Sequence, residues 1–181
     1  GAQILLSSKE TPLMQFGGIN TGRYKAGATP QTTHIFGWPM NNYWTTNFNA
    51  EQHGGFTWTY SISSEVKNSQ TDATRFGWEN MVPFLTRVLP GGGNGGGKPE
   101  GSVISGWPEN IILISAMPGT DGKSAIFHVR ETAGKSAQIE LKNEITSKNL
   151  IITEVDVVGN HVQNGSAQIE PFESKFLRVG L

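Results

Sequence analysis

The sequence predicts an all-β fold, specifically an antiparallel β-sandwich, and three observations lead to this class. Apolar and polar residues alternate with a period of two in several short windows, as they do in half-buried strands. Turn residues recur between these windows, and Asp121-Gly122 and Asn164-Gly165 have the sequence of hairpin turns. No window shows a sustained helical pattern with capping residues. Short strands joined by tight turns are typical of packed antiparallel sheets.

The first predicted strand covers residues 56–62. Phe56, Trp58, Tyr60 and Ile62 alternate there with threonine and serine, so the two sets of side chains point to opposite faces. We expect the aromatic face of this strand to be buried, with Trp58 in the core.

An apolar connection follows over residues 75–89. Because Pro83 interrupts it, we expect an irregular or short helical segment. A glycine-rich run then covers residues 91–97. In a P-loop this run would end in Gly-Lys-Ser/Thr and open a helix, whereas here Lys98 is followed by Pro99. We therefore interpret the run as a flexible loop or linker.

Three more strands are predicted after this loop. Residues 111–116 are continuously apolar, which is typical of a short strand buried on both faces. Alternation over residues 137–142 and 154–157 predicts two half-buried strands. The predicted organisation is the end of a large β-sandwich over residues 1–89, a glycine-rich loop or linker over 90–100, and C-terminal sandwich strands over 101–181.

Composition limits the classes of partner. The chain has 181 residues and a formal net charge of -1, which argues against a nucleic-acid-binding surface. Only 16% of the residues are charged, so we expect part of the surface to be covered by a partner or by the rest of a longer polypeptide. No membrane span and no signal peptide are predicted. Cysteine is absent, so no disulfide forms. The sequence therefore does not decide between a periplasmic or extracellular location and a cytoplasmic one.

The segment from Met40 to Phe48 carries the candidate binding residues. It holds three asparagines, two threonines and three aromatic residues within nine positions. Amides beside aromatic rings suit the binding of a sugar, because rings stack on its apolar face and amides bond to its hydroxyls. The same side chains also suit a wide loop that is hydrogen-bonded to a β-sandwich. The sequence leaves both interpretations open, and the carbohydrate-binding candidates are Asn42, Tyr43, Trp44 and Asn47.

No catalytic residue and no metal site are predicted within this chain. Glycoside hydrolysis needs two carboxylates on either side of the scissile bond. Glu51 and Glu79 have aromatic neighbours that would raise a carboxyl pKa by desolvation, but neither has an evident carboxylate partner. The four histidines lack the spacing of a compact metal site. An enzyme that uses Glu51 and Glu79 as acid and base is the third hypothesis, after the two given below.

Several motifs resemble those of one enzyme family. The segments 40–48 and 56–62 resemble the C-terminal β-rich region of bacterial α-mannosidases of glycoside hydrolase family 38. Further similar segments occur in the same order, from about Pro12 to Leu181, and these are residues 12–20, 111–116, 129–134 and 169–178. The resemblance implies a fold similar to the galactose-mutarotase-like supersandwich of these enzymes.

The resemblance also implies a function. In these α-mannosidases, zinc and an aspartate nucleophile belong to an N-terminal catalytic domain, and the motifs that carry them have no counterpart in residues 1–181. We therefore expect a non-catalytic C-terminal β-domain that braces the catalytic domain of the same polypeptide and helps to shape the sugar cleft. No cofactor is expected in this chain, whereas the parent enzyme is expected to bind zinc. The alternative is an autonomous carbohydrate-binding module. The expected partners are the catalytic domain of the same polypeptide and mannose-containing glycans.

Overall fold

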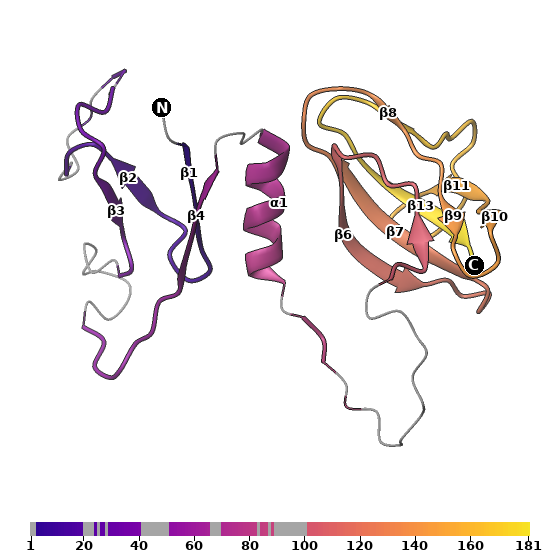
Figure 1. The fold of residues 1–181 in the computed structure, drawn as a ribbon, viewed down its shortest axis with the longest axis horizontal. Helices are drawn as coiled ribbons and strands as arrows, with labels where there is room; N and C mark the ends of the chain where they lie inside the picture. The colour runs from indigo at the N-terminus through magenta and orange to yellow at the C-terminus, as the bar shows by residue number, and fades with distance from the viewer. Residues whose placement is uncertain are drawn as a thin grey trace. The chain divides into compact units, whose positions relative to one another are not determined.

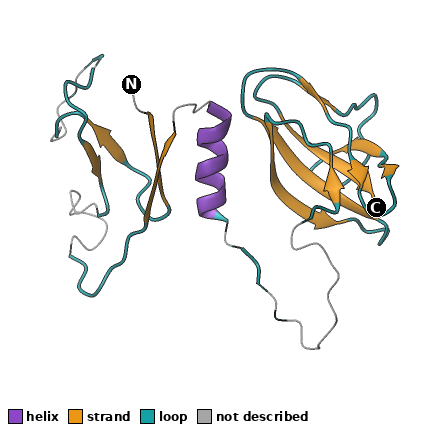
Figure 2. Ribbon diagram, viewed as in Figure 1, coloured by secondary structure: helices purple, strands orange, loops and turns teal. Residues whose placement is uncertain are grey.

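The computed structural model describes residues 3–19, 24, 26–27, 29–40, 51–65, 70–82, 84–86, 88 and 101–181. Antiparallel strands dominate these residues, which confirms the all-β class in its general form (Figures 1 and 2). The chain divides into two compact units. Unit 1 comprises Gly1–Lys67 and Phe76–Phe84, and unit 2 comprises Asn68–Arg75 and Leu85–Leu181.

Unit 1 is built from two separate strand pairs. β1 (Gln3–Ser8) pairs with β4 (Tyr60–Glu65), and β2 (Met14–Phe16) pairs with β3 (Ile35–Gly37), both antiparallel. Side chains from the loop after β1 reach β4 and the residue before it. Tyr60 donates a hydrogen bond from its hydroxyl to Thr11 Oγ1 at 3.1 Å, and Thr59 N donates to Glu10 Oε2 at 2.8 Å.

The main sheet of unit 2 has four strands in the order β11-β13-β7-β6, all antiparallel (Figure 1). These strands are β6 (Ile111–Pro118), β7 (Ser124–Glu131), β11 (Ile152–Val155) and β13 (Ser174–Gly180). Two smaller sheets complete the unit. One has the order β10-β9-β5, and the other pairs β12 with β8. Their strands are β5 (Ile104–Ser105), β8 (Ala137–Gln138), β9 (Lys142–Asn143), β10 (Lys148–Asn149) and β12 (Gln168–Ile169).

The apolar core of unit 2 draws on more than one of these sheets. Its buried side chains are Ile111, Phe127, Val129, Ile139, Leu141, Ile169, Leu177 and Val179. Alternate residues of β7 and β13 point inward, as the pleat requires, and Leu177 is paired with Phe127. The Trp107 ring packs on the edge of this core, with its centroid 5.6 Å from that of Phe127.

One helix departs from the predicted all-β pattern. α1 (Gln70–Met81) begins before the predicted connection and ends two residues before Pro83. Ala73, Arg75 and Met81 have good helix propensity, and the carboxylate of Asp72 in the first turn suits the positive end of the helix dipole. Sequence reasoning missed the start of α1 because the segment lacks a strong apolar periodicity.

Two strand predictions need correction. β4 begins at Tyr60 rather than Phe56, and Trp58 is half-buried and stacks on Phe56 with a centroid distance of 5.8 Å. The prediction that residues 111–116 are buried on both faces is wrong after Ile112. β6 is an edge strand, so its later residues from Leu113 are only partly covered or exposed.

The two predicted hairpin turns have different outcomes. Asp121-Gly122 joins the paired strands β6 and β7, and Gly122 has a φ of 64° that suits a tight turn. Asn164-Gly165 forms a turn, with Gly165 N donating to Val162 O at 3.1 Å, but it does not join two paired strands. β12, which follows this turn, pairs with β8 instead of β11.

Alternation predicted burial better than it predicted strand length. Ile139 and Leu141 are buried as expected, although the strand is broken into β8 and β9. Val155 is buried, but Val157 is 64% exposed. Asp156 ends β11 because its carboxylate accepts hydrogen bonds from Val158 N and Asn160 N, which closes a turn.

Candidate functional site

The predicted sugar-binding residues lie outside the described part of the chain. Asn42, Tyr43, Trp44 and Asn47 all fall within residues 41–50, as does most of the similar segment 40–48. Their role therefore stays a prediction. Trp38, which precedes this segment, is 39% exposed.

The two candidate acid–base residues occupy open positions. The Glu51 side chain is 85% exposed, and its Oε2 lies 3.8 Å from Nε2 of the exposed His53. Glu79 lies on α1 and is also exposed. Both side chains are therefore open to solvent. Neither residue contributes to the pocket described next.

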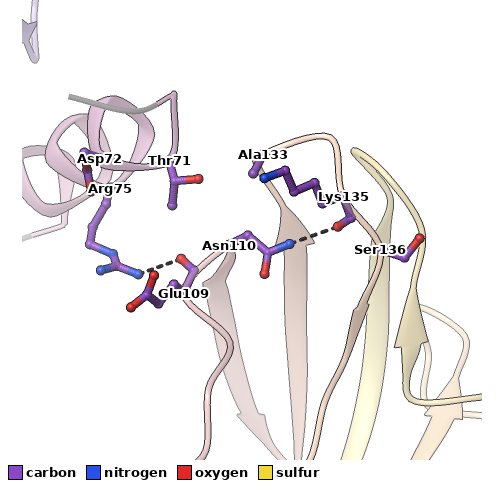
Figure 3. A pocket seen from close by; sticks show the side chains of 8 residues that line it. All are labelled: Thr71, Asp72, Arg75, Glu109, Asn110, Ala133, Lys135 and Ser136. Atoms are coloured by element: carbon purple, nitrogen blue, oxygen red, sulfur yellow. Dashed lines mark hydrogen bonds between the residues drawn. The ribbon is translucent and has the colours of Figure 1, made fainter. Parts of the chain in front are cut away.

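A polar pocket lies within unit 2, between the first half of α1, the turn before β6 and the loop after β7 (Figure 3). Its volume is about 570 Å³, which is within the range of small-molecule sites. Its lining side chains are Thr71, Asp72, Arg75, Glu109, Asn110, Ala133, Lys135 and Ser136. Two are acidic and two are basic, so their formal charges cancel, and no aromatic ring is among them.

The buried carboxylate of Glu131 holds two walls of this pocket together. Glu131 ends β7 and is fully buried. Its Oε1 accepts from Asn110 Nδ2 at 2.8 Å and from Ala133 N at 2.6 Å. Its Oε2 accepts from Gly134 N and from Phe172 N, both at 2.8 Å. One side chain thus connects the turn before β6, the loop after β7 and the turn before β13.

Glu131 is held in its ionised form by these donors. Burial raises the pKa of the carboxyl, but the hydrogen bonds from Phe172 N, Ala133 N, Asn110 and Gly134 N outweigh it and lower the pKa to about 2. The carboxylate therefore stays charged and fully hydrogen-bonded across the neutral pH range. A buried charge with this number of donors is a structural anchor.

The helix side of the pocket is attached at two points. Arg75 Nη2 donates to the backbone oxygen of Glu109 at 2.9 Å. Thr132 Oγ1 lies 3.4 Å from Thr71 Oγ1 and 3.1 Å from the backbone oxygen of Asn110. In Figure 3 the side chains of Thr71 and Lys135 face the space between the helix and the loops.

A second charged contact lies in the main sheet of unit 2. Lys175 Nζ is 3.0 Å from Glu154 Oε2, and the two side chains are 12% and 19% exposed. Burial raises the pKa of Glu154, but hydrogen bonds from Lys175 and from Ser166 N, with the charge of Lys175, hold it below its usual value. This pair connects β11 to β13 and has no role in the pocket.

Comparison with known proteins identifies no relative, since no family model, curated protein or solved structure matches the chain. Within the described residues, no three His, Asp or Glu side chains are grouped closely enough to hold a metal ion. The described residues also include no helix that is long and apolar enough to cross a membrane.

Sequence reasoning missed the pocket. Its residues come from three segments that are distant along the chain, and none of them forms a motif. One signal was present, because a charged Glu131 closes an apolar strand and is followed by Thr-Ala-Gly. A carboxylate in that position needs donors from a neighbouring loop.

Proposed function

We propose that this chain is a non-catalytic β-domain of an α-mannosidase-like glycoside hydrolase, which braces the catalytic part of that enzyme. The observation that carries the proposal is the uncovered apolar surface of unit 1. Ile4 and Ile62 are 60% and 69% exposed, and they lie on one face of the β1–β4 pair together with Tyr60. A two-stranded sheet with an uncovered apolar face is marginal in water, so it suits a sheet that another layer completes.

Further apolar residues support the same proposal. Phe84, Leu85 and Val88 are 94%, 100% and 91% exposed. Large apolar side chains that protrude in this way suit burial against another domain. The rest of the parent polypeptide is the occupant we propose for these surfaces.

The strand order fits the proposed relation to α-mannosidases. The later segments that resemble α-mannosidases correspond to β6, the end of β7 and most of β13, and these strands are neighbours in one sheet. We propose that this sheet and the two smaller sheets form the layers of a sandwich of the supersandwich type. The core that they share supports this architecture.

The proposal is tested by comparing the 181-residue chain with the longer polypeptide that the proposal expects its gene to encode. The open reading frame is expected to continue upstream of Gly1 into a segment with zinc ligands and an aspartate nucleophile. In that longer protein, Ile62→Asp is expected to lower the thermal midpoint by several degrees, because it places a charge in a covered interface.

Ile145→Asp is the matched control, since Ile145 is 77% exposed and belongs to unit 2. It should leave the midpoint of the longer protein unchanged. In the 181-residue chain, both variants should behave like the wild type. The proposal is contradicted if the reading frame has no such upstream segment. It is also contradicted if the two substitutions lower the midpoint of the longer protein equally.

An autonomous carbohydrate-binding module is the second candidate. It is favoured by the exposed aromatic residues on both sides of segment 41–50, which are Trp38 and Phe56, each 39% exposed. It predicts glycan binding that Trp44→Ala removes without lowering the thermal midpoint. Calorimetry that detects no heat with mannosides or other common glycans would count heavily against it.

A further inference from the structure

The walls of the polar pocket in unit 2 are fixed without a ligand. Asn110 Nδ2 donates to Glu131 Oε1 at 2.8 Å and to the backbone oxygen of Lys135 at 2.9 Å. The backbone oxygen of Asn110 accepts from Thr132 N at 2.9 Å. These bonds tie the turn before β6 to the loop after β7. A site whose walls are already ordered loses less entropy when it binds, and so binds more tightly.

The lining of the pocket offers both donors and acceptors of hydrogen bonds. Arg75 and Lys135 supply charged donors, whereas Asp72 and Glu109 supply carboxylate acceptors. Hydrogen bonds in which one partner is charged are about twice as strong as neutral ones. Hydroxyl groups can use both kinds of partner, since each donates one bond and accepts others.

The same lining disfavours other classes of ligand. The formal charges of the two acidic and two basic side chains cancel, so the pocket has no net charge that would attract a phosphate or a metal ion. Ala133 is its one apolar residue, so a flat aromatic or aliphatic ligand would gain little burial. Its volume of about 570 Å³ lies within the range of small-molecule sites.

We propose that this pocket is a binding site for a neutral polyhydroxylated ligand, such as the end of a glycan chain. Its lining includes no residue of segment 41–50, and the site gives the bracing domain a direct contact with carbohydrate. The inference rests on the proposed function for the choice of mannosides as probes. Arg75 and Lys135 donate to ring hydroxyls, Glu109 accepts from them, and Asn110 fixes the wall between these groups.

The test is a titration of the ¹⁵N-labelled 181-residue chain, followed by amide chemical shifts. The probes are methyl α-mannoside, a mannose disaccharide, inorganic phosphate and glycine. We expect the mannosides to bind with a Kd of about 1 mM, as is usual for a few hydrogen bonds without ring stacking. The shifts should be largest at the amides of Asn110, Ala133, Lys135 and Ser136.

Lys135→Gln removes one charged donor from an exposed side chain and should weaken mannoside binding about tenfold. Lys148→Gln is the matched control, because Lys148 is exposed on β10 and does not line the pocket. It should leave the Kd unchanged. Both variants are expected to fold, and their unperturbed spectra check this.

Four outcomes overturn the site. In the titrations, these are the absence of amide chemical-shift changes with either mannoside, and changes confined to residues 41–50. In the affinity measurements, they are equal weakening of mannoside binding by Lys135→Gln and Lys148→Gln, and tighter binding of phosphate or glycine than of mannosides. None of them bears on the bracing role, which is tested by the Ile62→Asp comparison in the longer polypeptide. The two experiments therefore test the carbohydrate site and the bracing role separately.

Discussion

Unit 2 and unit 1 differ in how they bury apolar side chains. Every apolar side chain that is buried among the described residues belongs to unit 2, where two fully buried examples are Val129 and Leu177. The described strands of unit 1 form two-stranded sheets, and Ile4 and Ile62 remain exposed. Unit 2 therefore has its own core, whereas the described strands of unit 1 contribute no buried apolar side chain. Similar alternation in sequence does not ensure a buried face, because a second layer must be present to cover it.

The largest effect is expected from a cavity in the core of unit 2. Leu177→Ala should lower the free energy of unfolding by about 3 kcal/mol, because Leu177 is fully buried between neighbouring strands. Leu6→Ala, on the half-buried β1, should cost less than about 1 kcal/mol. Urea unfolding followed by tryptophan fluorescence measures both. Similar losses for the two variants would remove the distinction between the units.

The buried carboxylate of unit 2 should have the next largest effect. Glu131→Gln keeps the shape of the side chain, but its amide nitrogen replaces one carboxylate oxygen and cannot accept the two hydrogen bonds of that oxygen. The lost pair is either Asn110 Nδ2 with Ala133 N or Gly134 N with Phe172 N. We expect a loss of about 2 kcal/mol of unfolding free energy. Glu140→Gln, at an exposed position, is the control and should be neutral.

Ionisation of Glu131 should also make the free energy of unfolding depend on pH. The pKa of Glu131 is lowered from 4.5 to about 2 on folding, so its charged form stabilises the folded state. This stabilisation is fully present above about pH 5 and is lost as the pH falls through the interval between the two values. Unfolding free energies measured from pH 6 to pH 2 should fall less steeply in Glu131→Gln than in the wild type. Parallel curves would show that Glu131 does not ionise as described.

A smaller effect is expected at the ion pair between β11 and β13. Lys175→Met removes the ammonium group that lies 3.0 Å from Glu154 Oε2 but keeps most of the aliphatic chain. We expect a loss of about 1 kcal/mol, since the pair is mostly but not fully buried. Lys142→Met, whose ammonium is 3.8 Å from the more exposed Glu144, should cost less. Thermal unfolding of the two variants under identical conditions makes this comparison.

The sequence predicted those parts of the fold that depend on local patterns. The burial of Ile139, Leu141 and Val155 follows from two-residue alternation, and the β6–β7 turn follows from Asp121-Gly122. The uncovered face of β4 and the edge position of β6 did not follow, because both depend on which layers and strands lie beside them. α1 was only partly anticipated, since its sequence has a weak apolar period.

The candidate site was less predictable than the fold. Asn110 and Lys135 approach each other because Glu131 joins the loops on which they lie, and such a contact is not visible in sequence spacing. Sequence reasoning favoured aromatic and amide residues, which form a motif, over the mixed charges of Arg75, Glu109 and Lys135. Convergent polar groups from separate segments are recognised only once their loops are placed.

The most direct test of the contrast between the units is amide hydrogen exchange in the 181-residue chain, measured strand by strand. Amides of β7 and β13 should exchange slowly, at rates set by global unfolding, because they lie within the cored sheet of unit 2. Amides of β1 and β4 should exchange much faster, because the apolar side chains of Ile4 and Ile62 in this strand pair are exposed. Equal protection of β1–β4 and β7–β13 in the 181-residue chain would contradict the account.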